Sequence, residues 1–205
     1  MERIKIYGSA ISGNCLKVKW TADLLGITYD WIETDILKGE TRTETFLALS
    51  PAGQIPIVVL EDGRVLEQSC AIMLYLAEQS GSNLVPSDPF EKATMISWLF
   101  WEQNFHESSI AVRRFRKRFA RLSDDDIDPT LLTRGNASLS LMENHLAAQD
   151  YFGGTRLGLP DIALVAYTRM AGEGGYALAD YPAVQAWIAR VEAALGIPSY
   201  TEEQA

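Results

Sequence analysis

The hydrophobic positions in the first third of the chain follow two different periods. Apolar and polar residues alternate over residues 4–6, as in a strand, and apolar residues then recur at helical spacing from Cys15 to Leu25. Residues 27–33 alternate again, and residues 46–49 are typical of a short helix. Two strands separated by a helix predict a parallel crossover unit.

The next segment is typical of a β-hairpin followed by a helix. Residues 55–60 are β-branched and apolar, and Asp62-Gly63 is a tight-turn signal before residues 65–66. These two strands are therefore expected to be antiparallel. Ser69 stands where a helix cap would be, ahead of a helical run of apolar residues. The predicted order of the first 80 residues is β-α-β-α-β-β-α.

Residues 81–89 separate this region from a second one with a purely helical pattern. The segment is rich in Gly, Ser, Asn and Pro and has no hydrophobic period, which is typical of a linker. We therefore predict one domain over residues 1–80 and another over residues 90–205. The helices expected in the second domain span residues 90 to about 122, 129–148, 160–171 and 182–195.

Charge and cysteine content argue against several classes of function. The 205 residues carry a formal net charge of −9, which would repel nucleic acid and anionic membranes. No stretch approaches the roughly 18 apolar residues of a membrane span and no secretory signal is evident, so we expect a cytoplasmic protein. The two cysteines and two histidines lack metal-site spacing, so neither a metal site nor a disulfide is expected.

Three motifs add to this architecture. Residues 50–56 (SPAGQIP) precede the hairpin, residues 68–76 (QSCAIMLYL) begin the next helix, and residues 158–162 (GLPDI) lie in the helical region. Together with the order of elements they resemble the glutathione transferase superfamily, continuously in the first domain and mainly by helical layout in the second. The resemblance implies a thioredoxin-like α/β domain with a mixed sheet, an all-α domain, a homodimer, and glutathione as co-substrate.

The resemblance also implies a cis peptide bond between Ile55 and Pro56. The backbone N–H and C=O of Ile55 would then be free to pair with the cysteinyl part of glutathione. On the local rule alone, Pro56 could equally stand at the first position of a strand, where it costs no ladder hydrogen bond.

The two ends of glutathione are expected to meet polar groups of the same domain. Ser69 opens a helix whose free N–H groups and positive terminus suit the γ-glutamyl carboxylate, although an ordinary helix cap is the simpler interpretation of an isolated Ser. Gln68 stands where many relatives have Glu and would accept a hydrogen bond from the ligand's ammonium. For the glycyl carboxylate the resemblance points to Gln54 and Arg42, with Lys38 as an equal candidate.

The catalytic group is expected in the segment SAISGNC, residues 9–15, where a helix begins and supplies the donors and positive field that a thiolate needs. By resemblance to serine-type transferases, Ser12 donates its hydroxyl to the glutathione sulfur, with Ser9 in reserve. Asn14 would orient the Ser12 hydroxyl or cap the helix. Cys15 stands where a redox C-x-x-C pair has its second cysteine, so it is a small buried hydrophobe or, less favoured, a nucleophile.

Aromatic residues make the first long helix of the second domain apolar on nearly all sides. The resemblance places an electrophile pocket between the domains, with Trp101, Phe105, Ile110 and Phe115 as its candidate residues. Core packing or a dimer interface is the more frequent explanation of such a pattern. Glu102 is a candidate for a contact with the γ-glutamyl ammonium across the dimer.

Asp161 resembles the structural capping aspartate of the family's later helix. The Ser or Thr that is usual three residues earlier is Gly158 here, so half of the reciprocal capping box is missing. Asp161 is expected to accept a hydrogen bond from the cap backbone and to matter for folding rather than for catalysis.

Together these features predict a glutathione transferase that stabilises the glutathione thiolate for attack on a small hydrophobic electrophile. A glutathione-dependent peroxidase or disulfide reductase would use the same thiolate. A non-catalytic relative would bind glutathione, a hydrophobic ligand or a protein partner. Ser12, Pro56 and Ser69 together favour retained glutathione binding, because a pure scaffold needs none of them as a set.

Overall fold

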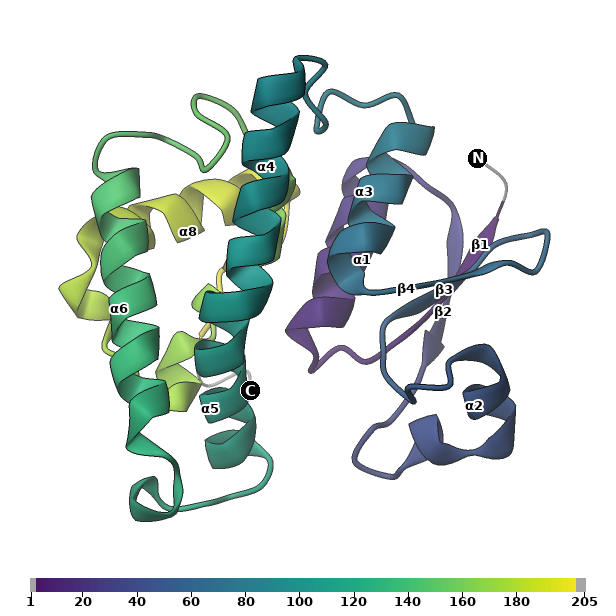
Figure 1. Ribbon diagram of the computed structural model, residues 1–205, viewed down its shortest axis with the longest axis horizontal. Helices are drawn as coiled ribbons and strands as arrows, with labels where there is room; N and C mark the ends of the chain where they lie inside the picture. Colours follow the sequence, from purple (N-terminus) through teal and green to yellow (C-terminus); the bar gives the residue numbers. More distant parts are fainter. Residues whose placement is uncertain (1–2, 202–205) are drawn as a thin grey trace. The chain divides into compact units, whose positions relative to one another are not determined.

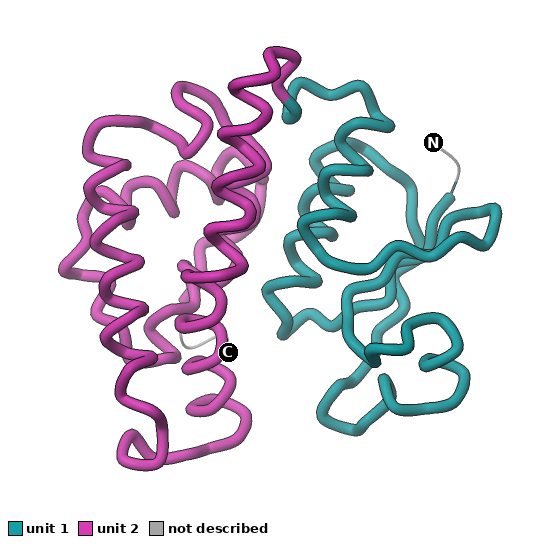
Figure 2. Tube along the Cα trace, viewed as in Figure 1, with its two compact units in different colours: residues 1–85 teal, residues 86–205 magenta. Residues whose placement is uncertain are grey.

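The chain divides after Val85 into two structural units, residues 1–85 and 86–205 (Figure 2). The computed structural model describes residues 3–201. The division lies in a segment without helix or strand, between Gln79 and Pro89. Each unit contains its own set of buried apolar side chains.

The first unit is a four-stranded mixed sheet with helices (Figure 1). Its main elements are β1 (Ile4–Gly8), α1 (Gly13–Leu24), β2 (Tyr29–Glu33), α2 (Glu44–Leu49), β3 (Ile57–Val59), β4 (Val65–Glu67) and α3 (Ser69–Gln79). The strands lie in the order β2-β1-β3-β4, with β1 parallel to β2 and antiparallel to β3, and with β3 antiparallel to β4. The predicted crossover unit, hairpin and thioredoxin-like order are confirmed.

The apolar positions of this unit converge on one core. Ile6 of β1 and Ile57 of β3 are fully buried, and so are Val18 of α1 and Ile72 of α3. The helices α1 and α3 pack against each other and lie side by side (Figure 1). The N-termini of these two helices therefore belong to one packed layer, which matters for the site described below.

Over residues 86–201, the second unit contains helices and one isolated bridge but no strand. Within residues 3–201, no helix is both long and apolar enough to cross a membrane. The main helices of the second unit are α4 (Pro89–Trp101), the π-helix η2 (Glu102–Glu107), α5 (Ser108–Arg118), α6 (Pro129–Leu146), α7 (Leu159–Thr168) and α8 (Pro182–Leu195).

The long helix expected over residues 90 to about 122 differs from the prediction in two ways. A turn of π-helix, η2, separates α4 from α5, and α5 ends at Arg118. The end of α5 is closed by a hydrogen bond from Leu122 N–H to Arg116 C=O, with Arg121 at a positive φ of 54°. The sequence does not indicate that the helix ends here, because helices that end in a left-handed residue usually have Gly or Asn at that position, whereas this chain has Arg121.

The centre of the second unit is α7, all of whose residues are buried. The Asp161 carboxylate of this helix accepts three hydrogen bonds at 2.9 Å, from the Gly158 and Phe152 backbone N–H groups and from Trp187 Nε1. The predicted bond from Asp161 to the cap backbone is confirmed. It ties together the start of α7, the preceding loop and α8, because Trp187 lies on α8.

Candidate functional site

The N-terminus of α1 carries the predicted catalytic residue. Ser12 is the N-cap of α1 and is partly exposed, and its Oγ accepts a hydrogen bond from the Cys15 backbone N–H at 3.4 Å. A hydroxyl that accepts in this way still has a proton to donate. Ser12 therefore combines a donor group with the positive end of a helix dipole, which is the environment that an anionic sulfur requires.

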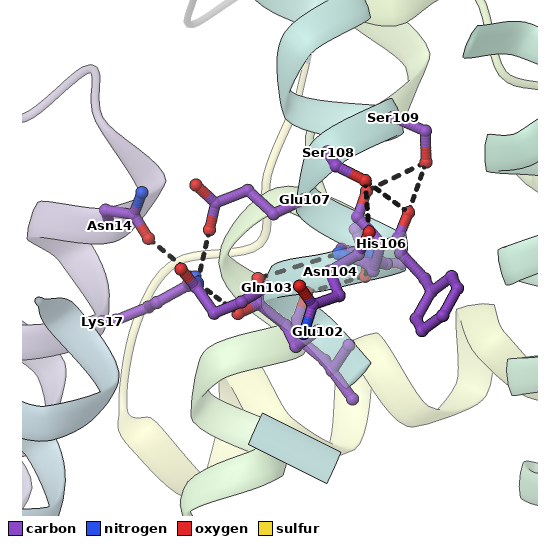
Figure 3. Close-up of polar contacts among 12 residues, drawn as sticks. Asn14, Lys17, Glu102, Gln103, Asn104, His106, Glu107, Ser108 and Ser109 are labelled. Atoms are coloured by element: carbon purple, nitrogen blue, oxygen red, sulfur yellow. Dashed lines mark hydrogen bonds and ion pairs between the residues drawn. The ribbon is translucent and has the colours of Figure 1, made fainter. Parts of the chain in front are cut away.

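Asn14 has a different position from the capping role considered for it. The cap is Ser12, and Asn14 Oδ1 accepts a hydrogen bond from Lys17 Nζ at 2.7 Å (Figure 3) and another from Ser69 Oγ at 3.0 Å. The first partner lies one turn further along α1 and the second is the first residue of α3. Asn14 therefore links the N-termini of the two helices rather than capping one of them.

The other two candidates in the same segment are buried. Ser9 is only 5% exposed, and its C=O accepts a hydrogen bond from the Ser12 N–H at 3.0 Å. Cys15 has no exposed surface, and burial raises the pKa of its thiol to about 11, although the Ser12 side chain opposes the rise. The core interpretation of Cys15 is supported, because a thiol of this kind is almost entirely protonated at neutral pH.

The start of α3 brings together the residues expected at the γ-glutamyl end. The Ile55-Pro56 bond is cis, as predicted. Gln68, rather than Ser69, is the N-cap of α3, so the prediction of Ser69 as the cap is wrong. Gln68 has a φ of 70°, a conformation that costs a non-glycine residue roughly 1–3 kcal/mol and that is frequent at ligand-binding sites. Ser69, at the first position of α3, is buried and donates its hydroxyl to Asn14.

The candidates for the glycyl end lie on two neighbouring loops. Arg42 Nη1 donates to the Ala52 C=O at 3.3 Å, and a side chain at Gly53 would collide with this guanidinium. Arg42 is thus fixed beside the loop that leads to Gln54, and both side chains are exposed. The Lys38 ammonium lies 3.1 Å from the Asp35 carboxylate and is largely exposed. Of the two candidate cations, Arg42 is the one held at the loop that precedes Gln54.

The four aromatic and aliphatic candidates of the helical unit do not share one environment. Phe105 on η2 is 55% exposed and Phe115 on α5 is 44% exposed, whereas Trp101 at the end of α4 is half-buried. Ile110 has no exposed surface. We therefore assign Ile110 to the core and retain only the three aromatic residues as candidates for ligand contact.

The π-helix η2 carries a polar cluster that is mostly buried. Gln103 Nε2 donates to Glu102 Oε2 at 2.8 Å and to Glu107 Oε2 at 2.7 Å (Figure 3). His106 Nε2 lies 2.9 Å from Thr168 Oγ1, and its Nδ1 lies 3.8 Å from Glu102 Oε1. Glu102 and His106, on the same π-helix, have no exposed surface. Among residues 3–201, no three His, Cys, Asp or Glu side chains are grouped to hold a metal ion.

Two family models and a solved structure match this chain over most of its length. The family description "Glutathione S-transferase, N-terminal domain" matches residues 11–79, and "Glutathione S-transferase, C-terminal domain" matches residues 106–194. A crystal structure of a glutathione S-transferase from Pseudomonas fluorescens is 41% identical, with a TM-score of 0.89 over 98% of this chain and 99% of that chain. The chain belongs to the glutathione S-transferase superfamily.

More distant members of the glutathione S-transferase superfamily show the same architecture. The theta class enzyme from Xanthomonas axonopodis pv. citri, whose structure has glutathione bound, is 28% identical with a TM-score of 0.85 over 98% of this chain and 99% of that chain. A probable glutathione S-transferase from Oryza sativa subsp. japonica is 28% identical over 196 residues, 91% of this chain and 90% of its own length. The superfamily fold predicted from the sequence, a thioredoxin-like unit followed by an all-helical unit, is therefore confirmed.

The two cysteines of this glutathione S-transferase homologue should differ sharply toward alkylating reagents. Cys70 is partly exposed, whereas Cys15 is fully buried with a raised pKa. We expect iodoacetamide at neutral pH to modify Cys70 first and to leave Cys15 unmodified in the folded protein, as read by peptide mass spectrometry. Faster modification of Cys15, with loss of glutathione-dependent turnover, would show that Cys15 is the nucleophile.

Proposed function

We propose that this chain is a glutathione transferase that stabilises the glutathione thiolate at the N-terminus of α1 for attack on a small hydrophobic electrophile. The observation that carries the proposal is the pair of helix N-termini, one with Ser12 and one with Ser69, joined through Asn14. A helix N-terminus stabilises an anion, and glutathione brings an ionisable thiol and a γ-glutamyl carboxylate.

Each polar end of glutathione has a matching group in the first unit. The carboxylate of the γ-glutamyl end would meet the backbone N–H groups at the start of α3, that of Ser69 included, because the Ser69 hydroxyl already donates to Asn14. The neighbouring ammonium would donate to the Gln68 amide. The cysteinyl backbone would pair with the N–H and C=O of Ile55. The glycyl carboxylate would meet Arg42, which the Ala52 carbonyl already holds beside Gln54, with Lys38 as the alternative cation.

The electrophile is proposed to be apolar and to contact the aromatic residues of the helical unit. Phe105 and Phe115 expose large apolar surfaces that a soluble partner molecule could cover. Trp101 is the third candidate. We also propose that the chain works as a homodimer, which light scattering of the purified protein would show as twice the mass of one chain.

A peroxidase or disulfide-reductase activity is the second candidate function. Such an activity would use the same glutathione thiolate, and it would not need a protein cysteine if glutathione itself attacks the peroxide or disulfide. The burial of Cys15 therefore argues against a cysteine-based version of this chemistry, but not against a glutathione-based one.

Calorimetry with glutathione, followed by turnover assays on a panel of electrophiles, tests the proposal. We expect binding at millimolar glutathione or below and turnover with halogenated aromatic compounds or epoxides. Turnover confined to peroxides would select the second candidate function. A lack of binding at millimolar glutathione would contradict the proposal and favour a protein-binding role, and binding without turnover on any substrate would favour a ligand carrier.

A further inference from the structure

Lys17 is a buried cation within one helical turn of the proposed thiol site. It is the fifth residue of α1, has no exposed surface, and donates from Nζ to Asn14 Oδ1 at 2.7 Å (Figure 3). Lysine is among the residues that are almost never fully buried, so its position here needs a reason. Nothing in the hydrophobic pattern of α1 indicates that this position is buried.

The direction of the Lys17 side chain increases its cost. The ammonium reaches back toward the first turn of α1, where the helix dipole is already positive, and a cation is unfavourable at that end of a helix. The arrangement concentrates positive charge beside Ser12, where the proposal requires an anion.

The hydrogen bonds of Asn14 show a second effect of Lys17. The amide oxygen of Asn14 faces both the Lys17 ammonium and the Ser69 hydroxyl, so Lys17 fixes which way the amide points. That orientation provides the acceptor for Ser69 at the start of α3. A single side chain thereby connects the thiol end and the carboxylate end of the proposed glutathione site.

The charge of Lys17 also acts on the thiol of Cys15, which lies on the same helix. Burial has the largest effect and raises the pKa of Cys15; of the two charged groups that act on it, Glu33 raises the pKa and Lys17 lowers it by a smaller amount. The hydrogen bond to Asn14 places the ammonium at the first turn of α1, and the sign of its effect on a sulfur there is the one that favours a thiolate. A thiolate bound outside the core, at Ser12, would feel the same field with less opposition from burial.

We propose that Lys17 is a positioning residue of the glutathione site, whose hydrogen bond orients Asn14 toward Ser69 and whose charge favours the bound thiolate. This inference rests on the proposed glutathione-binding function. Two effects of Lys17 can be separated: its hydrogen bond acts on the affinity for glutathione, and its charge acts on the ionisation of the bound glutathione thiol.

Three variants of Lys17 and one control separate these effects. Lys17→Met removes both the hydrogen bond and the charge, Lys17→Gln keeps a donor without the charge, and Lys17→Arg keeps the charge. Lys19→Met is the matched control, because it removes a lysine from the same helix whose partner, Asp23, lies on the surface at 2.7 Å. The readouts are the glutathione dissociation constant from calorimetry and the pKa of the bound thiol from ultraviolet thiolate absorbance.

We expect Lys17→Met to weaken glutathione binding about tenfold and to raise the pKa of the bound thiol by about one pH unit, as loss of a nearby opposite charge does. Lys17→Gln should retain most of the affinity but show the same raised pKa, and Lys17→Arg should restore the low pKa. Lys19→Met should match the wild type in both readouts. If circular dichroism shows that Lys17→Met does not fold, the comparison of Lys17→Gln with the wild type decides whether the charge of Lys17 lowers the pKa of the bound thiol.

The outcomes distinguish this inference from the function on which it rests. If the wild-type protein does not bind glutathione, the proposed function fails. If the wild type binds glutathione but folded Lys17→Gln titrates with an unchanged thiol pKa, only the inference about Lys17 fails. An equal effect of Lys19→Met would also overturn it, because the effect would then come from net charge rather than from position.

Discussion

Replacement of Ser12 by Ala is expected to lower glutathione-dependent turnover by about 10- to 100-fold. A hydrogen bond to a charged group contributes roughly 1.5–3 kcal/mol, and each 1.4 kcal/mol corresponds to a factor of ten in rate or equilibrium. We expect the rate and the ionised fraction of the glutathione thiol to decrease. The affinity for glutathione should change only modestly, since its peptide backbone and both of its carboxylates are proposed to bind to residues other than Ser12. Steady-state kinetics across glutathione concentrations measures both quantities.

Two neighbouring variants are the controls for this prediction. Ser9→Ala and Cys15→Ala change buried residues of the same segment and should leave turnover per folded molecule within a few-fold of wild type. Undiminished turnover in Ser12→Ala, together with its abolition in either of the other two, would show that the catalytic group has been assigned to the wrong residue.

Replacement of Asp161 by Ala is expected to lower the free energy of unfolding by about 3–5 kcal/mol. The substitution removes the acceptor of three hydrogen bonds and leaves the N–H groups of Phe152 and Trp187 buried without it, at roughly 1–3 kcal/mol each. Asp161→Asn should cost less, because its Oδ1 still accepts these two bonds and only the bond from Gly158 is lost. Urea denaturation measures both. Equal stability of Asp161→Ala and wild type would contradict the structural role.

The carboxyl group of Asp161 should also make the free energy of unfolding depend on pH. Burial raises the pKa of Asp161 to about 6 from its ordinary value of 3.8, against the opposing effect of its hydrogen bonds. The folded protein therefore holds this proton more tightly than the unfolded chain, so stability from this group is present below about pH 4 and is lost as the pH rises to about 6. The difference between wild type and Asp161→Asn should change by up to about 3 kcal/mol over that range. A flat difference would contradict the raised pKa.

The elements of the first unit were predictable because their signals are local. The period of two in β1 and β2 and the turn pair Asp62-Gly63 each depend on a few adjacent residues, and the sheet order follows from them. The π-helix η2 was not predictable, since a single wider turn hardly changes the hydrophobic period on either side.

The residue types of the candidate site were predictable, but the hydrogen bonds between its residues were not. Ser12 at a helix start could be read from the sequence, whereas the bond between Asn14 and Ser69 joins residues 55 positions apart. The burial of Lys17 depends on packing around α1 and contradicts the usual exposure of lysine. The predicted cap of α3, Ser69, is one residue too late, because the cap is Gln68 at a positive φ. A positive φ is rare for residues other than glycine, so the sequence does not indicate it.

The most direct test of the account is the pKa of the glutathione thiol bound to the wild-type protein and to Ser12→Ala. Free thiols titrate at about 8.5, and the account predicts a value at least one pH unit lower in the wild-type complex. In Ser12→Ala the value should return most of the way toward that of free glutathione. A wild-type complex whose thiol titrates like free glutathione, while turnover persists, would contradict thiolate stabilisation at the α1 N-terminus.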